Sequence, residues 1–498
     1  MQTNRFVPII LMMLCLHVAT SCENDDTPSI EPAEESYADS LLVRTVLDGL
    51  YTKGVPALHL YSDDNDGIPA AWESYLSGLF KSEATEGFYP DLTDRQLSSP
   101  SVRELSSSIY ARCFDGIEAA DSIVSLLPDT PGLSLSERAR LAGEAKFFRA
   151  LNRFYLIRAF GGYPNKRTDT SFLKPEAAFS VVEKDLLDAV ATLPEKGFVE
   201  NHMHVTAYAA RTLLAEVYLS MSGKPLGKDR YRQAAELLRP VIHSGKHRLE
   251  KNGALESLSA FNVLRTTPTS DEYLYVAFGE SGHSLASFAF PRKAREWEQL
   301  KTDVAFNAFE PTRTFMRCYE DNDLRGKDRQ FFHTFLKIKD DGKTVFELFN
   351  PAPYFWISEN ADPQEPARQA VGIYRYSEVL LMASEAIVQS EGVTAEAVSY
   401  LAQVRSRATE ADEGKMQQAL MSLSVEDFLH QIWLERLREL PFEMKQLTDI
   451  NRTGYFPESR NDTLIFVPYH NAAVTGERQG VSQGLYLPHP ARSSPGQE

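Results

Sequence analysis

Apolar residues at helical spacing are the clearest pattern along this chain. The segment 134–161 opens with a capping box formed by Ser134 and Glu137 and closes at consecutive glycines, which are helix start and stop signals. Its apolar residues recur every three or four positions, at Leu141, Ala145, Phe148, Leu151 and Tyr155. Because about 3.6 residues complete one turn, these side chains share a face. The segment is therefore predicted to be one long helix.

Further helices are predicted in adjacent pairs. One pair covers 206–223 and 231–242 and is joined by a short turn, and a similar pair covers 374–388 and 395–408. Another helix is predicted at 425–440. Pairs of this kind stack side by side and bury a shared core, so the layout resembles tetratricopeptide-type repeats. The expected fold class is mainly α.

The region from about 243 to 370 lacks this helical spacing. Glycine, proline, asparagine and aspartate interrupt it, and short strand-like runs occur at 273–278 and 331–338. We therefore expect a loop-rich, irregular middle region between an N-terminal and a C-terminal helical part.

Residues 1–21 are predicted to be a lipoprotein signal peptide. An apolar run, 6–16, follows Arg5, is too short to span a bilayer, and leads to small residues before Cys22. This arrangement resembles a bacterial lipobox, in which the cysteine thiol is lipidated and becomes the mature N-terminus. Each buried methylene of the lipid contributes about 0.8 kcal/mol to anchoring. An ordinary secretory signal, with an incidental Cys22, is the alternative.

An acidic, flexible tether is predicted at 22–36. It contains the cluster 23–26 and is rich in proline, serine and glutamate, without the apolar residues that packing requires. An acidic cluster behind a lipidated cysteine looks like the surface-export signal of lipoproteins in the Bacteroidetes. Residues 37–498 remain for the folded domain.

Composition narrows the possible partners and cofactors. The formal net charge is -17, which argues against nucleic acid and favours an uncharged or cationic ligand. Cys113 and Cys318 have no Cys or His neighbour at metal-ligand spacing and are expected to be buried thiols, with a disulfide between them left open. No zinc motif of the His-Glu-x-x-His kind and no phosphate-binding glycine loop occurs, so neither metal nor cofactor is expected.

Several segments, in order, resemble the SusD/RagB family of outer-membrane nutrient-binding lipoproteins along nearly all of the mature length. They are 144–164, 185–194, 206–219, 374–386, 404–408, 435–440 and 449–452. The most characteristic is the helix and turn from Glu144 to Pro164. One departure is at the C-terminal end, where family members commonly carry Leu-Pro-Ile-Pro and then Asn-Pro. This chain has only Phe466-Val467-Pro468 and Leu487-Pro488-His489-Pro490.

The resemblance implies both a fold and a role. The fold would be a tetratricopeptide-like helical scaffold with irregular insertions, as in SusD. The protein would be lipid-anchored to the outer membrane, face the cell exterior and sit on a SusC-like, TonB-dependent transporter. It would bind oligosaccharides, or peptides in some branches, and hand them over without catalysis.

A glycan platform needs exposed aromatic rings beside polar side chains, because sugar rings stack on flat faces and their hydroxyls need hydrogen bonds. The segment 61–89 has this mixture, and a further aromatic residue lies in the middle region. The ligand-binding candidates are Asp64, Trp72, Tyr75, Tyr89 and Trp297. For Trp72 and Tyr75, three positions apart, packing on one helical face is the alternative.

Other functions have weaker support in the sequence. Residues 62–73 match part of a calcium-binding EF-hand loop, but the first position is Ser62 and Pro69 interrupts the loop. The segment 282–286 faintly resembles a nucleophile elbow, without the alternating strands and helices that such hydrolases need. A peptide-binding or purely structural lid remains the main alternative, because helical grooves can hold an extended chain.

Overall fold

A computed structural model shows a mainly α-helical protein. It describes residues 32–62, 67–169, 171–281, 285–292, 304–340, 343–356, 367–460, 463–468 and 485–490. The long N-terminal helices are α1 (Pro32–Leu50), α5 (Pro100–Leu126), α6 (Leu135–Phe160), α7 (Pro175–Thr192), α8 (Ala207–Ser222) and α9 (Tyr231–His243). The C-terminal helices are α12 (Tyr376–Glu391), α13 (Ala395–Thr409), α14 (Glu413–Met421), α15 (Val425–Glu439) and α16 (Gln446–Thr453).

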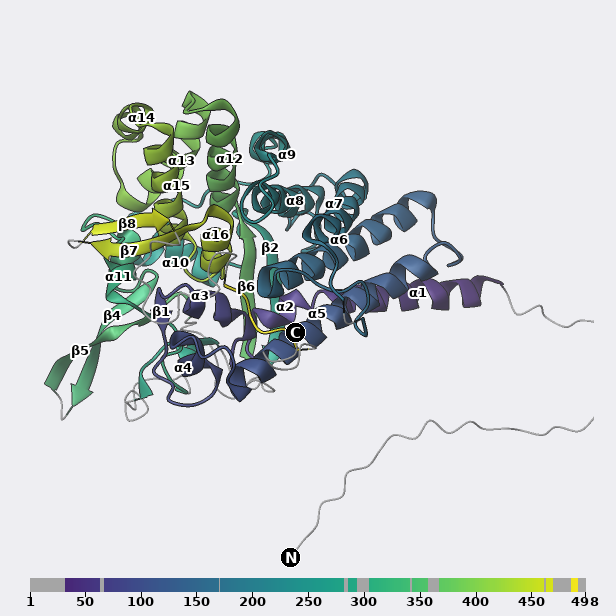
Figure 1. Ribbon diagram of the computed structural model, residues 1–498, viewed down its shortest axis with the longest axis horizontal. Coiled ribbons are helices and arrows are strands. Elements are labelled where there is room, and N and C mark those ends of the chain that lie inside the picture. The colour runs from purple at the N-terminus through teal and green to yellow at the C-terminus, as the bar shows by residue number, and fades with distance from the viewer. Residues whose placement is uncertain are drawn as a thin grey trace, which may run out of the picture.

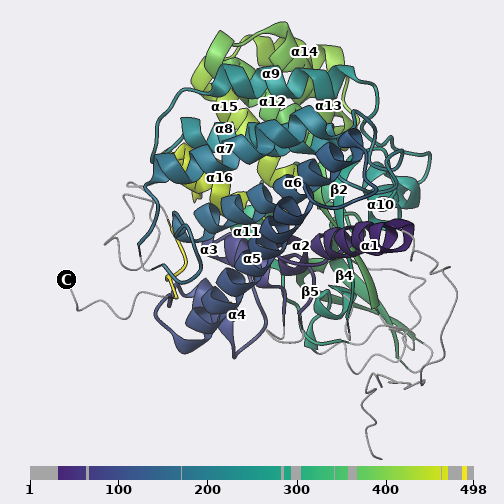
Figure 2. The same cartoon turned by 90° about the vertical axis from the view of Figure 1, so that its right-hand side faces the viewer.

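The helices form a continuous array in which each packs on the next, from α5 through α9 and then from α12 to α14 (Figures 1 and 2). Helix α9 packs directly on α12, although the whole middle region separates them in the sequence. The predicted tetratricopeptide-like stacking of helix pairs is therefore confirmed. The observed bounds of α6, α8, α9, α13 and α15 agree with the predicted helices to within about two residues.

Local signals explain where α6 begins and ends. Ser134 accepts a hydrogen bond from the Glu137 backbone N–H, and the Glu137 side chain bonds back to the Ser134 N–H, which completes the capping box. At the other end Gly161 adopts a left-handed conformation with φ 73°, which a side chain would disfavour. The predicted start and stop are both confirmed.

The middle region is rich in loops and short elements, as predicted. The short helices of the chain are α2 (Val55–Leu58), α3 (Trp72–Leu76), α4 (Phe88–Thr93), α10 (Ala260–Thr266) and α11 (Arg313–Met316). The described strands form antiparallel pairs: β1 (Phe80–Lys81) with β3 (Glu310–Pro311), β2 (Tyr273–Ser281) with β6 (Ala367–Arg375), β4 (Phe332–Asp340) with β5 (Lys343–Pro353), and β7 (Tyr455–Arg460) with β8 (Thr463–Pro468). Strand β6 leads straight into α12, so it joins the middle region to the C-terminal helices.

One expectation about the N-terminal end of the chain needs correction, whereas the expected buried thiols are confirmed. The expected tether, 22–36, is too long, because α1 already begins at Pro32. Helix α1 packs on α5 and α6, and Arg44 pairs with Glu137 at 3.1 Å. Cys113 and Cys318 are both buried and free, so the disulfide that the sequence left open does not form. Cys22 lies outside the described residues.

Buried ion pairs hold the C-terminal helices to the middle region. Arg375, at the end of β6, contacts Glu439 of α15 at 2.9 Å and Glu272 at 3.0 Å. Arg325, in the middle region, contacts Glu435 at 2.8 Å and Glu439 at 2.9 Å. These ion pairs form one structural network that reaches from α15 to β6 and the middle region.

Glu439 is held as an anion in this network. Burial by itself would raise the pKa of this carboxyl group, but the surrounding arginine guanidinium groups outweigh burial and lower the pKa to about 2. An ordinary glutamate in the unfolded chain titrates near about 4.3. The stabilisation is therefore fully present above that value and is lost as the pH falls toward 2.

We predict that Glu439→Gln lowers the free energy of unfolding by about 3–5 kcal/mol, because it leaves buried guanidinium groups without their anion. Urea unfolding at pH 7 measures the loss. Between pH 4.5 and 2 the variant should also lose stability less steeply than the unchanged protein, since it lacks this titrating group. Glu391→Gln is the control: its pair with Arg239 is partly exposed, so the change should cost under about 1 kcal/mol. Equal losses in both variants would contradict the prediction.

Candidate functional site

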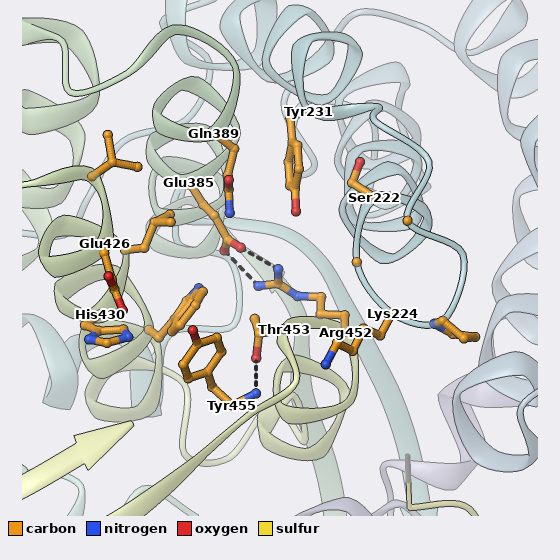
Figure 3. A pocket seen from close by; sticks show the side chains of 16 residues that line it. Ser222, Lys224, Tyr231, Glu385, Gln389, Glu426, His430, Arg452, Thr453 and Tyr455 are labelled. Atoms are coloured by element: carbon orange, nitrogen blue, oxygen red, sulfur yellow. Dashed lines mark hydrogen bonds and ion pairs between the residues drawn. The ribbon is translucent and has the colours of Figure 1, made fainter. Parts of the chain in front are cut away.

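A pocket of about 540 Å³ lies where the helix pair α8–α9 meets the C-terminal helices (Figure 3). Residues from the end of α8, the loop that follows it, α9, α12, α15, α16 and the first residue of β7 line it. The pocket therefore exists only because segments that are distant in the sequence are brought together by the helical array.

An aromatic wall lines one side of the pocket. Trp433 and Tyr455 have ring centroids 5.1 Å apart, and His430 lies 5.4 Å from Trp433. Helix α15 supplies His430 and Trp433 from one turn, together with Leu429, which lies four residues before Trp433. Gly454 ends α16 with φ 75° and directs the chain into β7, which places Tyr455 beside the tryptophan. Figure 3 shows Tyr231 on the other side of the pocket.

A buried ion pair forms the floor between these walls. Arg452 of α16 bonds to both carboxylate oxygens of Glu385 on α12, at 2.5 and 2.8 Å (Figure 3). Its Nε also donates to Asp449 at 2.8 Å. Burial opposes the charge of Arg452, but the two carboxylates outweigh burial and raise its pKa well above the ordinary value. The guanidinium is thus fixed and neutralised rather than free to bind an anion.

The loop after α8 closes the pocket against α16. The Lys224 N–H donates to the carbonyl oxygen of Arg452 at 2.8 Å. A Cβ atom on Gly223 would lie 2.2 Å from that same oxygen, so only glycine allows this close approach. Lys224 and Glu426 are exposed and lie at the rim.

Two buried nitrogen atoms in the pocket lack a hydrogen-bond partner in the described part of the chain. The Nε1 of Trp433 and the Nε2 of His430 are buried, and neither has a hydrogen-bond partner among the described residues. Tyr231 is half-buried, and burial raises the pKa of its phenol, so the hydroxyl stays protonated at neutral pH. A buried donor without a partner costs about 1–3 kcal/mol, so such groups are typical of sites that a ligand or water completes.

The residues that the sequence favoured for glycan stacking lie elsewhere. Trp72, Tyr75 and Tyr89 are 1%, 1% and 2% exposed, and they pack in the core. Trp72 Nε1 donates to the Tyr155 hydroxyl at 3.1 Å, and the rings of Tyr75 and Tyr89 lie 5.3 Å apart. No sugar could stack on these faces in this structure. Asp64 and Trp297 lie outside the described residues.

The sequence pattern did not single out the pocket residue Trp433 as a site residue, and the reason is physical. Val425, Leu429 and Trp433 recur at a spacing of four along α15, and such a stripe indicates core packing. Trp433 is indeed only 8% exposed. The signal that separates it from a core tryptophan is its unpaired indole N–H, which no sequence pattern reveals.

In the segment 62–73, which partly matches a calcium-binding EF-hand loop, Glu73 at the last ligand position is not available to bind a calcium ion. Glu73 is fully buried, pairs with Arg158 and accepts a hydrogen bond from Thr448 at 2.8 Å. Residues 63–66 lie outside the described part of the chain. Within the described part, no cluster of three His, Cys, Asp or Glu side chains could hold a metal ion.

The SusD family profile matches residues 357–478. This match covers the C-terminal helices α12 to α16. The chain is 23% identical over 292 residues to a SusD-like protein of Bacteroides ovatus, an alignment that covers 53% of this chain and 50% of that protein. The match thus spans about half the length of this curated relative. The predicted resemblance to the SusD family is confirmed.

Solved structures share the fold over most of this chain. A SusD superfamily protein from Parabacteroides distasonis has a TM-score of 0.69 at 22% identity, covering 88% of this chain and 92% of that one. A SusD homolog from Bacteroides thetaiotaomicron has a TM-score of 0.66 at 19% identity, covering 85% and 88%. Surface glycan-binding protein A from Bacteroides uniformis has a TM-score of 0.64 at 17% identity, covering 83% and 88%. At these identities the likeness establishes the fold.

We predict that Trp72→Ala lowers the free energy of unfolding by about 3–5 kcal/mol, because it opens a cavity in the core. Trp72→Phe keeps most of the ring volume and should lose much less. Thermal or urea unfolding of the two variants measures both effects. If Trp72→Ala left stability unchanged, the ring would be exposed in solution, and its expected role in ligand stacking would stand again.

Proposed function

We propose that this chain is a SusD-family, glycan-binding lipoprotein of the outer membrane that passes oligosaccharides to a SusC-like, TonB-dependent transporter. The observation that carries the proposal is the SusD scaffold itself, which superposes on SusD-superfamily structures along most of the chain. One of the similar folds bears the name of a surface glycan-binding protein. A stacked helical array leaves broad faces for a large partner, while loops and junctions between helix pairs vary in their ligands.

The pocket supports binding rather than catalysis. Its buried carboxylate, Glu385, has both oxygens engaged by Arg452, so neither oxygen is left to act on a ligand. Glycoside hydrolysis needs two carboxyl groups poised on either side of one bond. The other pocket carboxylate, Glu426, is exposed at the rim. We therefore propose a protein that holds its ligand without turning it over.

Membrane attachment would follow from the N-terminal end. Helix α1 projects beyond the helical array at the end where the chain enters it (Figure 1). Residues 22–31 precede it, and at ~3.3–3.6 Å per residue they reach at most about 35 Å. A lipidated Cys22 would thus hold α1 close to the bilayer. No helix in the described ranges combines the length and apolar character of a membrane span.

We predict that the protein cut after Cys22 binds at least one polysaccharide from a panel of plant, host and microbial glycans. Affinity electrophoresis measures this as retarded migration. Reducing ends counted before and after incubation should not increase, because the protein does not hydrolyse its ligand. Absence of retardation on every glycan would favour the peptide-binding or structural-lid alternative, and release of new reducing ends would indicate a surface hydrolase.

We further predict that Cys22→Ala moves the protein from the membrane to the soluble fraction of a Bacteroidetes host, because no lipid can then be attached. Cell fractionation with immunoblotting measures the shift. Cys15→Ala is the matched control: Cys15 lies inside the predicted signal peptide and should not affect attachment. Membrane retention of Cys22→Ala would show that the cysteine is incidental.

A further inference from the structure

The pocket between α8–α9 and the C-terminal helices is made of different residues from the segment 61–89 and Trp297, to which the sequence pointed. We propose that this pocket is itself a carbohydrate site, which takes a short, uncharged saccharide. The inference rests on the proposed glycan-binding function and adds a place and a ligand class to it. Four properties of the pocket lead to it.

The first property is size. A volume of about 540 Å³ falls within the range of small-molecule pockets, about 300–1,000 Å³. A flat platform would accept the side of a long polymer, whereas this hollow accommodates about one or two sugar rings. A short saccharide, or the end of a longer one, therefore fits the enclosure.

The second property is the arrangement of aromatic groups. Tyr231 and Tyr455 lie on opposite sides of the pocket (Figure 3), and the ring of Trp433 packs beside that of Tyr455. Pyranose rings carry apolar C–H faces and polar edges, and aromatic side chains match the apolar faces while polar groups meet the edges. A ligand that is apolar all round would leave the polar groups of the pocket unpaired.

The third property is the unpaired indole N–H. Trp433 is only 8% exposed, and its Nε1 has no hydrogen-bond partner among the described residues. An indole N–H can only donate, so the group that completes it must be a hydrogen-bond acceptor. A sugar hydroxyl or ring oxygen is one, whereas an ammonium or guanidinium group is not. This atom argues against a lysine or arginine side chain as the ligand.

The fourth property is charge balance. The charged side chains that line the described pocket are Lys224, Glu385, Glu426 and Arg452. Two are cationic and two are anionic, and Arg452 with Glu385 already forms a bidentate pair. An acidic or amino sugar would therefore gain little over a neutral one. The net charge of -17 for the whole chain also disfavours anionic ligands.

The test is a nuclear magnetic resonance titration that follows the signal of the Trp433 indole N–H. The chain cut after Cys22 is labelled with isotope-enriched tryptophan. It is titrated with the neutral saccharides glucose, galactose, mannose, N-acetylglucosamine, maltose and cellobiose. Glucuronic acid and glucosamine are titrated in parallel as an anionic and a cationic sugar. Trp433→Phe assigns its resonance by loss of the signal. We expect at least one neutral saccharide to shift the Trp433 indole N–H signal, while the Trp72 signal, from the buried core, stays in place.

Binding affinities of variants provide the second readout. Trp433→Phe keeps an aromatic ring but removes the donor, and should weaken binding of that saccharide about tenfold. Tyr231→Ala removes one stacking face and should weaken it at least as much. The matched control, Trp72→Phe, removes a buried indole outside the pocket and should change the affinity less than twofold.

Affinity electrophoresis on the same proteins separates this inference from the proposed function. Polysaccharide retardation without any shift of the Trp433 signal would overturn the pocket assignment and leave glycan binding in place. Preferential binding of glucuronic acid or glucosamine would overturn the neutral-ligand assignment. No binding of either kind would overturn both proposals.

Discussion

The buried ion pairs around Glu439 are the constraint on which the rest of this structure depends. Glu439 closes α15, Arg375 closes β6, and Arg325 comes from the middle region, yet all three meet away from solvent. Taking charges out of water is expensive, and the cost is offset only when each charge meets its partner at good geometry. The network therefore penalises any arrangement in which these three segments separate, which fixes the middle region against the C-terminal helices.

A second group of buried ion pairs fixes the helices that line the candidate site. Arg436 of α15 contacts Asp449 of α16 at 2.7 Å, and Asp449 also holds Arg452, which binds Glu385 of α12. The floor of the pocket is thus the edge of a connected set of charges rather than a flexible surface. A site whose groups are already fixed loses little conformational entropy on binding, so it favours a ligand that matches its existing shape.

The pocket lies where its rim can change without disturbing the scaffold. The helical array is held by apolar faces and buried charges, while the pocket lies at the junction of a helix pair with later helices. Lys224 and Glu426 lie exposed at its rim, where substitution does not disturb the core. Changes there would alter the ligand without weakening the stacking of α8, α9 and α12.

The sequence by itself determined most of the helices, the loop-rich middle region and the resemblance to the SusD family. Capping boxes such as that of Ser134 and Glu137, and apolar spacing along α6, act within a few turns, so they are visible without the fold. Only the tertiary structure decided which aromatic rings could meet a ligand. The buried indole of Trp72 donates to Tyr155, 83 residues away, whereas Trp433 lies at a pocket with no partner for its N–H among the described residues. Exposure and hydrogen bonding depend on which distant segments pack together, and a local pattern carries no record of that.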